Sequence, residues 1–127
     1  MKSFTAIFVA AIVLLLTSST ILWAEEQTPV KDALFVVHFK TGSAWKPELP
    51  PNEQAGFQGH SANLQRLRKE GRIVFGTRYA DLGMIFLKAG DKDIAVEELD
   101  EDPGVKAGIF EYEVEKMNVF YPWKDGD

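Results

Sequence analysis

The stretch Leu34-Phe35-Val36-Val37-His38-Phe39, residues 34–39 of this 127-residue chain, decides the fold. Its length and its β-branched and aromatic side chains predict a β-strand. Because both alternating sets of side chains are mainly apolar, we expect this strand at the centre of a sheet. His38 alternates with Leu34 and Val36, so its side chain is expected on the same sheet face as theirs. That face either lines the cavity of a barrel or leaves His38 as an ordinary core or surface residue.

Two later stretches are expected to be helical. One helix is indicated by five residues spaced alternately by three and four positions, as on one helix face: Phe57, His60, Leu64, Leu67 and Gly71. Asn52 is its expected N-cap and Gly71 its terminator. The other helix should follow Asp91 as N-cap and end by Asp102, because Pro103 cannot continue a helix.

Three further strands are expected, at residues 72–79, 82–88 and 108–117, the first two joined by a short hairpin at residues 80–81. The resulting order, β-α-β-β-α-β, is that of one ferredoxin-like split unit, so the fold class is α+β. Two helices cover only one face of such a sheet. Burying the other face against a second copy predicts a C2 homodimer whose sheets face each other, with the aromatic stretch 119–123 across the interface.

The first 24 residues have the layout of a secretory signal peptide. Lys2 precedes an apolar run from Phe4 to Leu16, and Ala24 is the expected last residue before cleavage, with a second possible site at Thr17/Ser19. An uncleaved membrane anchor is the alternative. Either reading predicts an exported protein, periplasmic or extracellular, with a linker at 25–33, one domain at 34–123 and a polar tail at 124–127.

Composition excludes several classes of function. The chain has no cysteine and two histidines, which argues against disulfides, thiol nucleophiles and a structural zinc site. Its net charge of −5 offers no basic stripe for nucleic acid. Isolated glycines form no phosphate-binding loop. We therefore expect no metal, no cofactor and no nucleic-acid partner, and contact with a membrane only if residues 1–24 stay uncleaved.

Three blocks of sequence are distinctive: Pro-Glu-Leu-Pro-Pro-Asn-Glu-Gln-Ala-Gly-Phe-Gln-Gly-His at 47–60, Gly-Thr-Arg-Tyr-Ala-Asp-Leu-Gly-Met at 76–84 and Asp-Pro-Gly-Val-Lys-Ala-Gly-Ile-Phe at 102–110. Together they resemble the YCII-related proteins. The resemblance covers residues 34–123 and implies a dimeric α+β barrel with a His–Asp pair in a pocket, carried here by His60 and Asp102. It implies no particular reaction. The wider barrel superfamily acts on small, often aromatic, compounds, and most YCII relatives lack an export signal.

His60 and Asp102 are the candidate catalytic residues. A carboxylate that fixes one imidazole nitrogen as a donor leaves the other free to move a proton. The alternatives are a core histidine and an aspartate that only ends a helix. A negative charge at a helix C-terminus is unfavourable, which favours a specific partner for Asp102.

Arg78, Tyr79 and Asp81, at the hairpin, are the candidate substrate-binding residues. The Arg78 guanidinium is suited to a substrate carboxylate or enolate; pairing with Asp81 or with an acid of a dimer mate is the alternative. Trp45, in the loop after the first strand, is either a lid or a packing plug. The sequence thus predicts an acid–base isomerase, lyase or hydrolase for a small organic substrate. A non-catalytic ligand-binding module and a structural dimer of the cell envelope are the alternatives.

Overall fold

The computed structural model describes residues 31–122 and 124 of the chain. The predicted signal peptide or anchor at 1–24 lies outside the described residues, as do most of the predicted linker, Trp123 and residues 125–127. Within the part of the chain that is described, no helix is long and apolar enough to cross a membrane.

Four antiparallel strands form one sheet in the order β2-β3-β1-β4. They are β1 (Ala33–Thr41), β2 (Ile73–Tyr79), β3 (Leu82–Ala89) and β4 (Phe110–Lys116). The apolar stretch at 34–39 lies in β1, which pairs with β3 on one side and with β4 on the other. The central position of this strand and the α+β ferredoxin-like fold are therefore as the sequence predicts.

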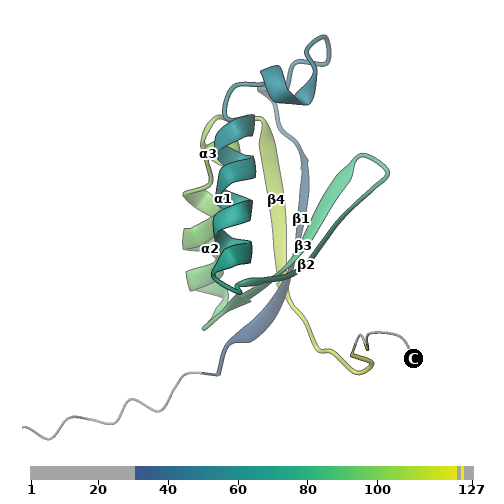
Figure 1. Cartoon of the computed structure of the whole chain (residues 1–127), viewed down its shortest axis with the longest axis vertical. Coiled ribbons are helices and arrows are strands. Elements are labelled where there is room, and N and C mark those ends of the chain that lie inside the picture. Colours follow the sequence, from purple (N-terminus) through teal and green to yellow (C-terminus); the bar gives the residue numbers. More distant parts are fainter. Residues whose placement is uncertain (1–30, 123, 125–127) are drawn as a thin grey trace, which may run out of the picture.

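Helices α1 (Phe57–Lys69) and α2 (Lys92–Asp100) pack on one side of the sheet, as Figure 1 shows. The Asp91 side chain caps α2 as predicted, with Oδ1 accepting from the backbone N–H of Ile94 at 2.9 Å. The structure adds a short third helix, α3 (Pro103–Lys106), between α2 and β4. It lies beside the first turns of α1.

Helix α1 begins later than predicted. Asn52 lies in a separate 3₁₀ turn, η1 (Pro51–Glu53), and the N-cap of α1 is Gly56 in the left-handed region at φ 86°. The buried Gln54 explains this start. Its side-chain amide accepts from the Lys46 N–H at 3.0 Å and donates to the carbonyls of Lys46 and Leu49, so residues 46–54 are held as a loop.

The hydrophobic core lies between the sheet and the helices. Phe35, Val37 and Phe39 of β1 alternate toward it, and each is no more than 4% exposed. The remaining core comes mainly from β3, α1 and α2: Ile85, Leu87, Ala89, Leu67, Ala95 and Leu99. In the first turn of α1, the rings of Phe57 and His60 pack against Phe110 at the start of β4.

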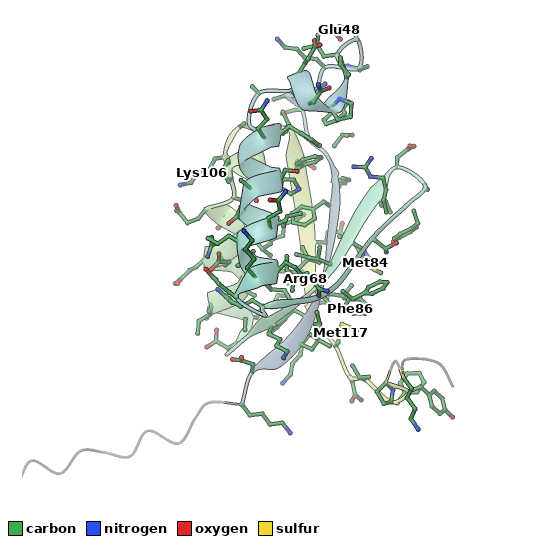
Figure 2. All side chains as sticks on the ribbon, viewed as in Figure 1. Glu48, Arg68, Met84, Phe86, Lys106 and Met117 are labelled. Atoms are coloured by element: carbon green, nitrogen blue, oxygen red, sulfur yellow. The ribbon has the colours of Figure 1, made fainter. Side chains whose placement is uncertain are left out.

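The opposite face of the sheet is not covered by any helix among residues 31–122 (Figure 1). Met84 and Phe86 project from β3 on this side (Figure 2). A register shift between Ile73 and Phe75 interrupts the alternation of side chains along β2. Because of this bulge, Ile73 lies on the helix side of the sheet, the same side as Gly76 and Arg78, and is buried there.

Candidate active site

His60 and Asp102 come together although 42 positions separate them in the sequence. His60 Nδ1 lies 2.8 Å from Asp102 Oδ1. Both residues are buried, with 7% of His60 and 1% of Asp102 exposed. His60 is in the first turn of α1 and Asp102 immediately precedes α3, so the contact depends on how these two helices meet.

Asp102 is the N-cap of α3 rather than a residue that only ends α2, which corrects the view of it as an unfavourable charge at a helix C-terminus. Its Oδ1 accepts from the backbone N–H groups of Gly104 at 2.9 Å and Val105 at 3.2 Å. Oδ2 accepts from Asn63 Nδ2 at 2.8 Å. A negative charge is favourable at a helix N-terminus. The carboxylate thus has partners on both oxygens.

These hydrogen bonds determine the charge on Asp102. Burial on its own raises the pKa of this carboxyl, but the hydrogen bonds from His60 and Asn63 outweigh burial and hold the pKa below its ordinary value. Because the folded-state pKa is lowered, the ionised group stabilises the fold at neutral pH. That contribution is lost as the pH falls through the folded-state pKa.

An ionised Asp102 fixes the tautomer of His60. A carboxylate can only accept hydrogen bonds, so the Nδ1 of a neutral His60 carries the proton that it shares with Asp102. The other ring nitrogen, Nε2, is then unprotonated and can accept a proton. The pair therefore has the arrangement of a histidine general base oriented by a carboxylate.

Two glycines allow α1 and α3 to approach closely enough for this contact. A Cβ on Gly59 would lie 2.6 Å from the Cβ of Pro103, and a Cβ on Gly104 would lie 3.0 Å from the Cβ of His60. Real Cβ atoms do not approach other atoms so closely without displacement. No local sequence pattern indicates this role for either glycine.

Aromatic rings surround the imidazole. The ring centroid of Phe110 lies 4.5 Å from that of His60, and the centroid of Phe39 lies at 5.2 Å. Trp45 packs on Phe110 at 5.8 Å. This apolar shell keeps water from most of the His60–Asp102 pair and strengthens its electrostatic interactions.

A partly open cavity of about 750 Å³ lies next to His60, between α1 and the β2–β3 hairpin. Trp45 lines it together with Phe57 and Phe110, so Trp45 both packs against a neighbouring ring and forms part of the cavity wall. Asp102 is behind His60 and is not part of the lining. The volume is of the size that accommodates a small organic molecule.

The three predicted substrate-binding residues separate into two groups. Arg78 and Asp81 line the same cavity as His60. The Arg78 guanidinium forms no ion pair with Asp81 or with another described residue. Tyr79 is absent from the lining and instead packs edge-on against His38, with ring centroids 6.3 Å apart, on the uncovered sheet face. A substrate contact by Tyr79 would need a site on that face.

The fold and this geometry define a ferredoxin-like α+β domain with a buried His–Asp pair beside a cavity. No protein-family model matches the chain, and no curated protein matches it. Among solved structures it is similar to 5-chloro-2-hydroxyhydroquinone dehydrochlorinase (TftG) from Burkholderia phenoliruptrix in complex with 2,5-dihydroxybenzoquinone. The two are 24% identical, with 73% of this chain and 95% of that chain covered and a TM-score of 0.45. At this distance the similarity assigns neither a family nor an activity, and the resemblance to YCII-related proteins stays a prediction.

The close approach at Gly59 leads to a stability prediction. Gly59→Ala should lower the free energy of unfolding by about 1 kcal/mol or more, because the new methyl group forces α1 away from Pro103 and outweighs the gain in helix propensity. Urea denaturation measures this. Gly83→Ala is the control, since its Cβ would meet nothing closer than 3.7 Å. Equal stability of the two variants would contradict the packing described.

Proposed function

We propose that this chain is an acid–base enzyme that needs no cofactor and acts on a small organic molecule, as an isomerase, lyase or hydrolase. The observation that carries the proposal is the buried His60–Asp102 hydrogen bond at 2.8 Å, with His60 in the wall of the cavity. Proton transfer of this kind requires one positioned base and a group that stabilises the developing negative charge.

His60 is the proposed base. Its Nδ1 is engaged by Asp102, so Nε2 is the nitrogen available to a molecule in the cavity. When Nε2 takes a proton from a substrate C–H or O–H group, the imidazole becomes positively charged, and Asp102 stabilises that charge. In an isomerase the proton is returned to the same molecule at another atom, and in a lyase it goes to the leaving group. In a hydrolase Nε2 instead takes the proton from a water molecule that attacks the substrate, and the leaving group receives that proton.

Arg78 is the proposed group that stabilises negative charge on the substrate. It lies on β2, across the cavity lining from α1, and its guanidinium has no carboxylate partner among the described residues. A planar guanidinium suits the two oxygens of a carboxylate or an enolate. Asp81, which also lines the cavity, adds a hydrogen-bond acceptor for a substrate hydroxyl.

We propose that the protein is a homodimer with the uncovered sheet faces together. Apolar side chains point away from the helices on this face, including Val36, Met84 and Phe86, while Phe75 is 42% and Tyr79 45% exposed. An apolar patch that a domain leaves exposed is usually a binding surface, and a C2 partner presents the same patch in return.

The proposed base is tested by exchange of substrate C–H groups in D2O, which requires only that a proton is abstracted and a deuteron from the solvent is returned to the same carbon. A panel of enolisable ketones, lactones and hydroxy acids is followed by ¹H NMR. We expect catalysed exchange for at least one compound and a loss of at least about 100-fold in His60→Gln.

His38→Gln is the matched control, because it changes the other histidine, which lies on the opposite sheet face. It should keep the exchange activity. Near-UV circular dichroism checks that both variants are folded. Asp102→Asn, which keeps the shape of the side chain but removes its charge, should also lose the exchange activity. Unchanged exchange in folded His60→Gln would contradict the proposal. Saturable binding of a compound with neither exchange nor turnover would support the second candidate function, a non-catalytic small-ligand binder.

The proposed dimer is tested by sedimentation equilibrium. The wild type should have twice the mass of one chain, and Phe86→Lys should shift it toward one chain, because a charge would have to be buried between the sheets. Ile94→Lys is the control, since Ile94 is also apolar and is 46% exposed but lies on α2. A monomeric wild type, or equal loss of mass in both variants, would contradict this interface.

We also propose that the domain acts outside the cytoplasm, periplasmic or extracellular, on the sequence pattern of residues 1–24 alone. Sequencing the N-terminus of protein recovered from the cell envelope and the medium tests this. A mature chain that begins near Glu25 is expected; a chain that still carries residues 1–24 in the membrane fraction would support the anchor, and one in the cytosol would contradict export.

A further inference from the structure

Asn63 links the His60–Asp102 pair to a group of charged residues on the surface. His60, Asn63 and Arg66 follow one another at three-residue spacing along α1, so they lie on adjacent parts of one helix face. The Asn63 Nδ2 group donates to Asp102 Oδ2 at 2.8 Å. Arg66 Nη2 donates to the Asn63 side-chain oxygen at 2.8 Å. Asn63 therefore bridges an exposed cation and a buried anion.

Asn63 is the only donor to Asp102 Oδ2 among the described residues, whereas three groups donate to Oδ1. Every buried side-chain nitrogen and oxygen in this part of the chain has a hydrogen-bond partner. Removing the Asn63 amide would leave one oxygen of a carboxylate that is 1% exposed without its partner. An unpaired buried acceptor on a charged group is costly, so protonation of Asp102 would become easier.

Arg66 determines which way the Asn63 amide points. A guanidinium only donates hydrogen bonds, so the amide oxygen has to face Arg66 and the amide nitrogen has to face Asp102. Reversing the amide would set its oxygen against the carboxylate and its N–H group against the guanidinium. Both contacts would then be repulsive.

Arg66 is itself held from two helices. Its Nη1 donates to both carboxylate oxygens of Glu70, the C-cap of α1, at 3.0 Å, and its Nη2 donates to Glu98 on α2. Arg72 donates to the second oxygen of Glu98 at 2.7 Å. The guanidinium thus has a defined position relative to Asn63 although its side chain is 48% exposed.

We propose that Asn63 is a positioning residue for the His60–Asp102 pair and that Arg66 fixes the orientation of its amide. Asn63 is not among the residues that line the cavity. Its role is to complete the hydrogen bonds of ionised Asp102, so that Nδ1 of His60 stays a donor and Nε2 stays the free base. For its effect on rate, this inference rests on the proposed function.

Few charged groups lie close enough to Asp102 to affect its pKa. His60 faces it from α1, and Arg66 is linked to it through the hydrogen bonds of the Asn63 amide. The neighbouring Glu101 and Lys106 form an ion pair with each other at the surface. Changes at Asn63 or Arg66 should therefore act on Asp102 through the contacts described above.

The first experiment measures the pKa of the Asp102 carboxyl by ¹³C NMR in the full domain. In Asn63→Leu, which removes the donor but keeps the bulk, the pKa of Asp102 should rise by about one unit or more. Gln65→Leu is the matched control, because it removes an exposed amide from the same helix. An unchanged pKa of Asp102 in folded Asn63→Leu would overturn the proposal.

Arg66→Ala tests the second half of the proposal and also serves if Asn63→Leu fails to fold, because Arg66 lies on the surface. The pKa of Asp102 should rise in the same direction and by less than in Asn63→Leu. Arg68→Ala is its control, since Arg68 donates to the carbonyls of Ile73 and Val74 instead. A pKa in Arg66→Ala equal to the wild-type value would overturn the role of Arg66.

A kinetic measurement separates this inference from the proposed function. With a compound that exchanges deuterium, Asn63→Leu should lower kcat by about tenfold, as expected for the loss of one hydrogen bond, and leave KM unchanged. If no compound exchanges but the pKa of Asp102 moves as expected, the proposed function fails and the positioning role stands. If exchange is catalysed and the pKa of Asp102 does not move, the positioning role fails alone.

Discussion

The hydrogen bond between His60 and Asp102 is the interaction on which the rest of the site depends. A carboxylate that is 1% exposed is stable only if both of its oxygens have donors. Those donors come from three places, namely the imidazole, the Asn63 amide and the backbone at the start of α3. Satisfying them requires that α1 and α3 meet closely, which is why Gly59 and Gly104 have no side chain at the contact.

Aromatic side chains exclude water from one side of the His60–Asp102 pair, and on the other side His60 borders the cavity. Phe39 and Phe110 shield the imidazole, while the cavity gives it access to a small molecule. Arg78 reaches the same cavity from β2, so a base and a cation are presented from opposite layers of the fold. The two layers are held together by the core between sheet and helices. The geometry of the proposed chemistry therefore depends on packing far from the cavity.

Local patterns in the sequence predict most of the fold. Alternation in β1, helical spacing in α1 and the Asp91 cap of α2 depend on residues close together in the chain, and each is found where it was expected. The predicted start of α1, after Asn52, is wrong because the buried Gln54 side chain holds residues 46–54 in a loop that precedes the helix. The site is predictable only in part. A His–Asp pair follows from residue types and resemblance, but the part played by Asn63 depends on a contact with a residue 39 positions away, which no local pattern reveals.

The tautomer of His60 tests the central claim most directly. Long-range ¹H–¹⁵N correlation NMR at neutral pH distinguishes a protonated ring nitrogen from an unprotonated one. The hydrogen bond to ionised Asp102 predicts that a neutral His60 carries its proton on Nδ1 and has a free Nε2. A proton on Nε2, with Nδ1 unprotonated, would contradict the account, because Asp102 would then have to be the protonated partner and His60 would have no free base facing the cavity.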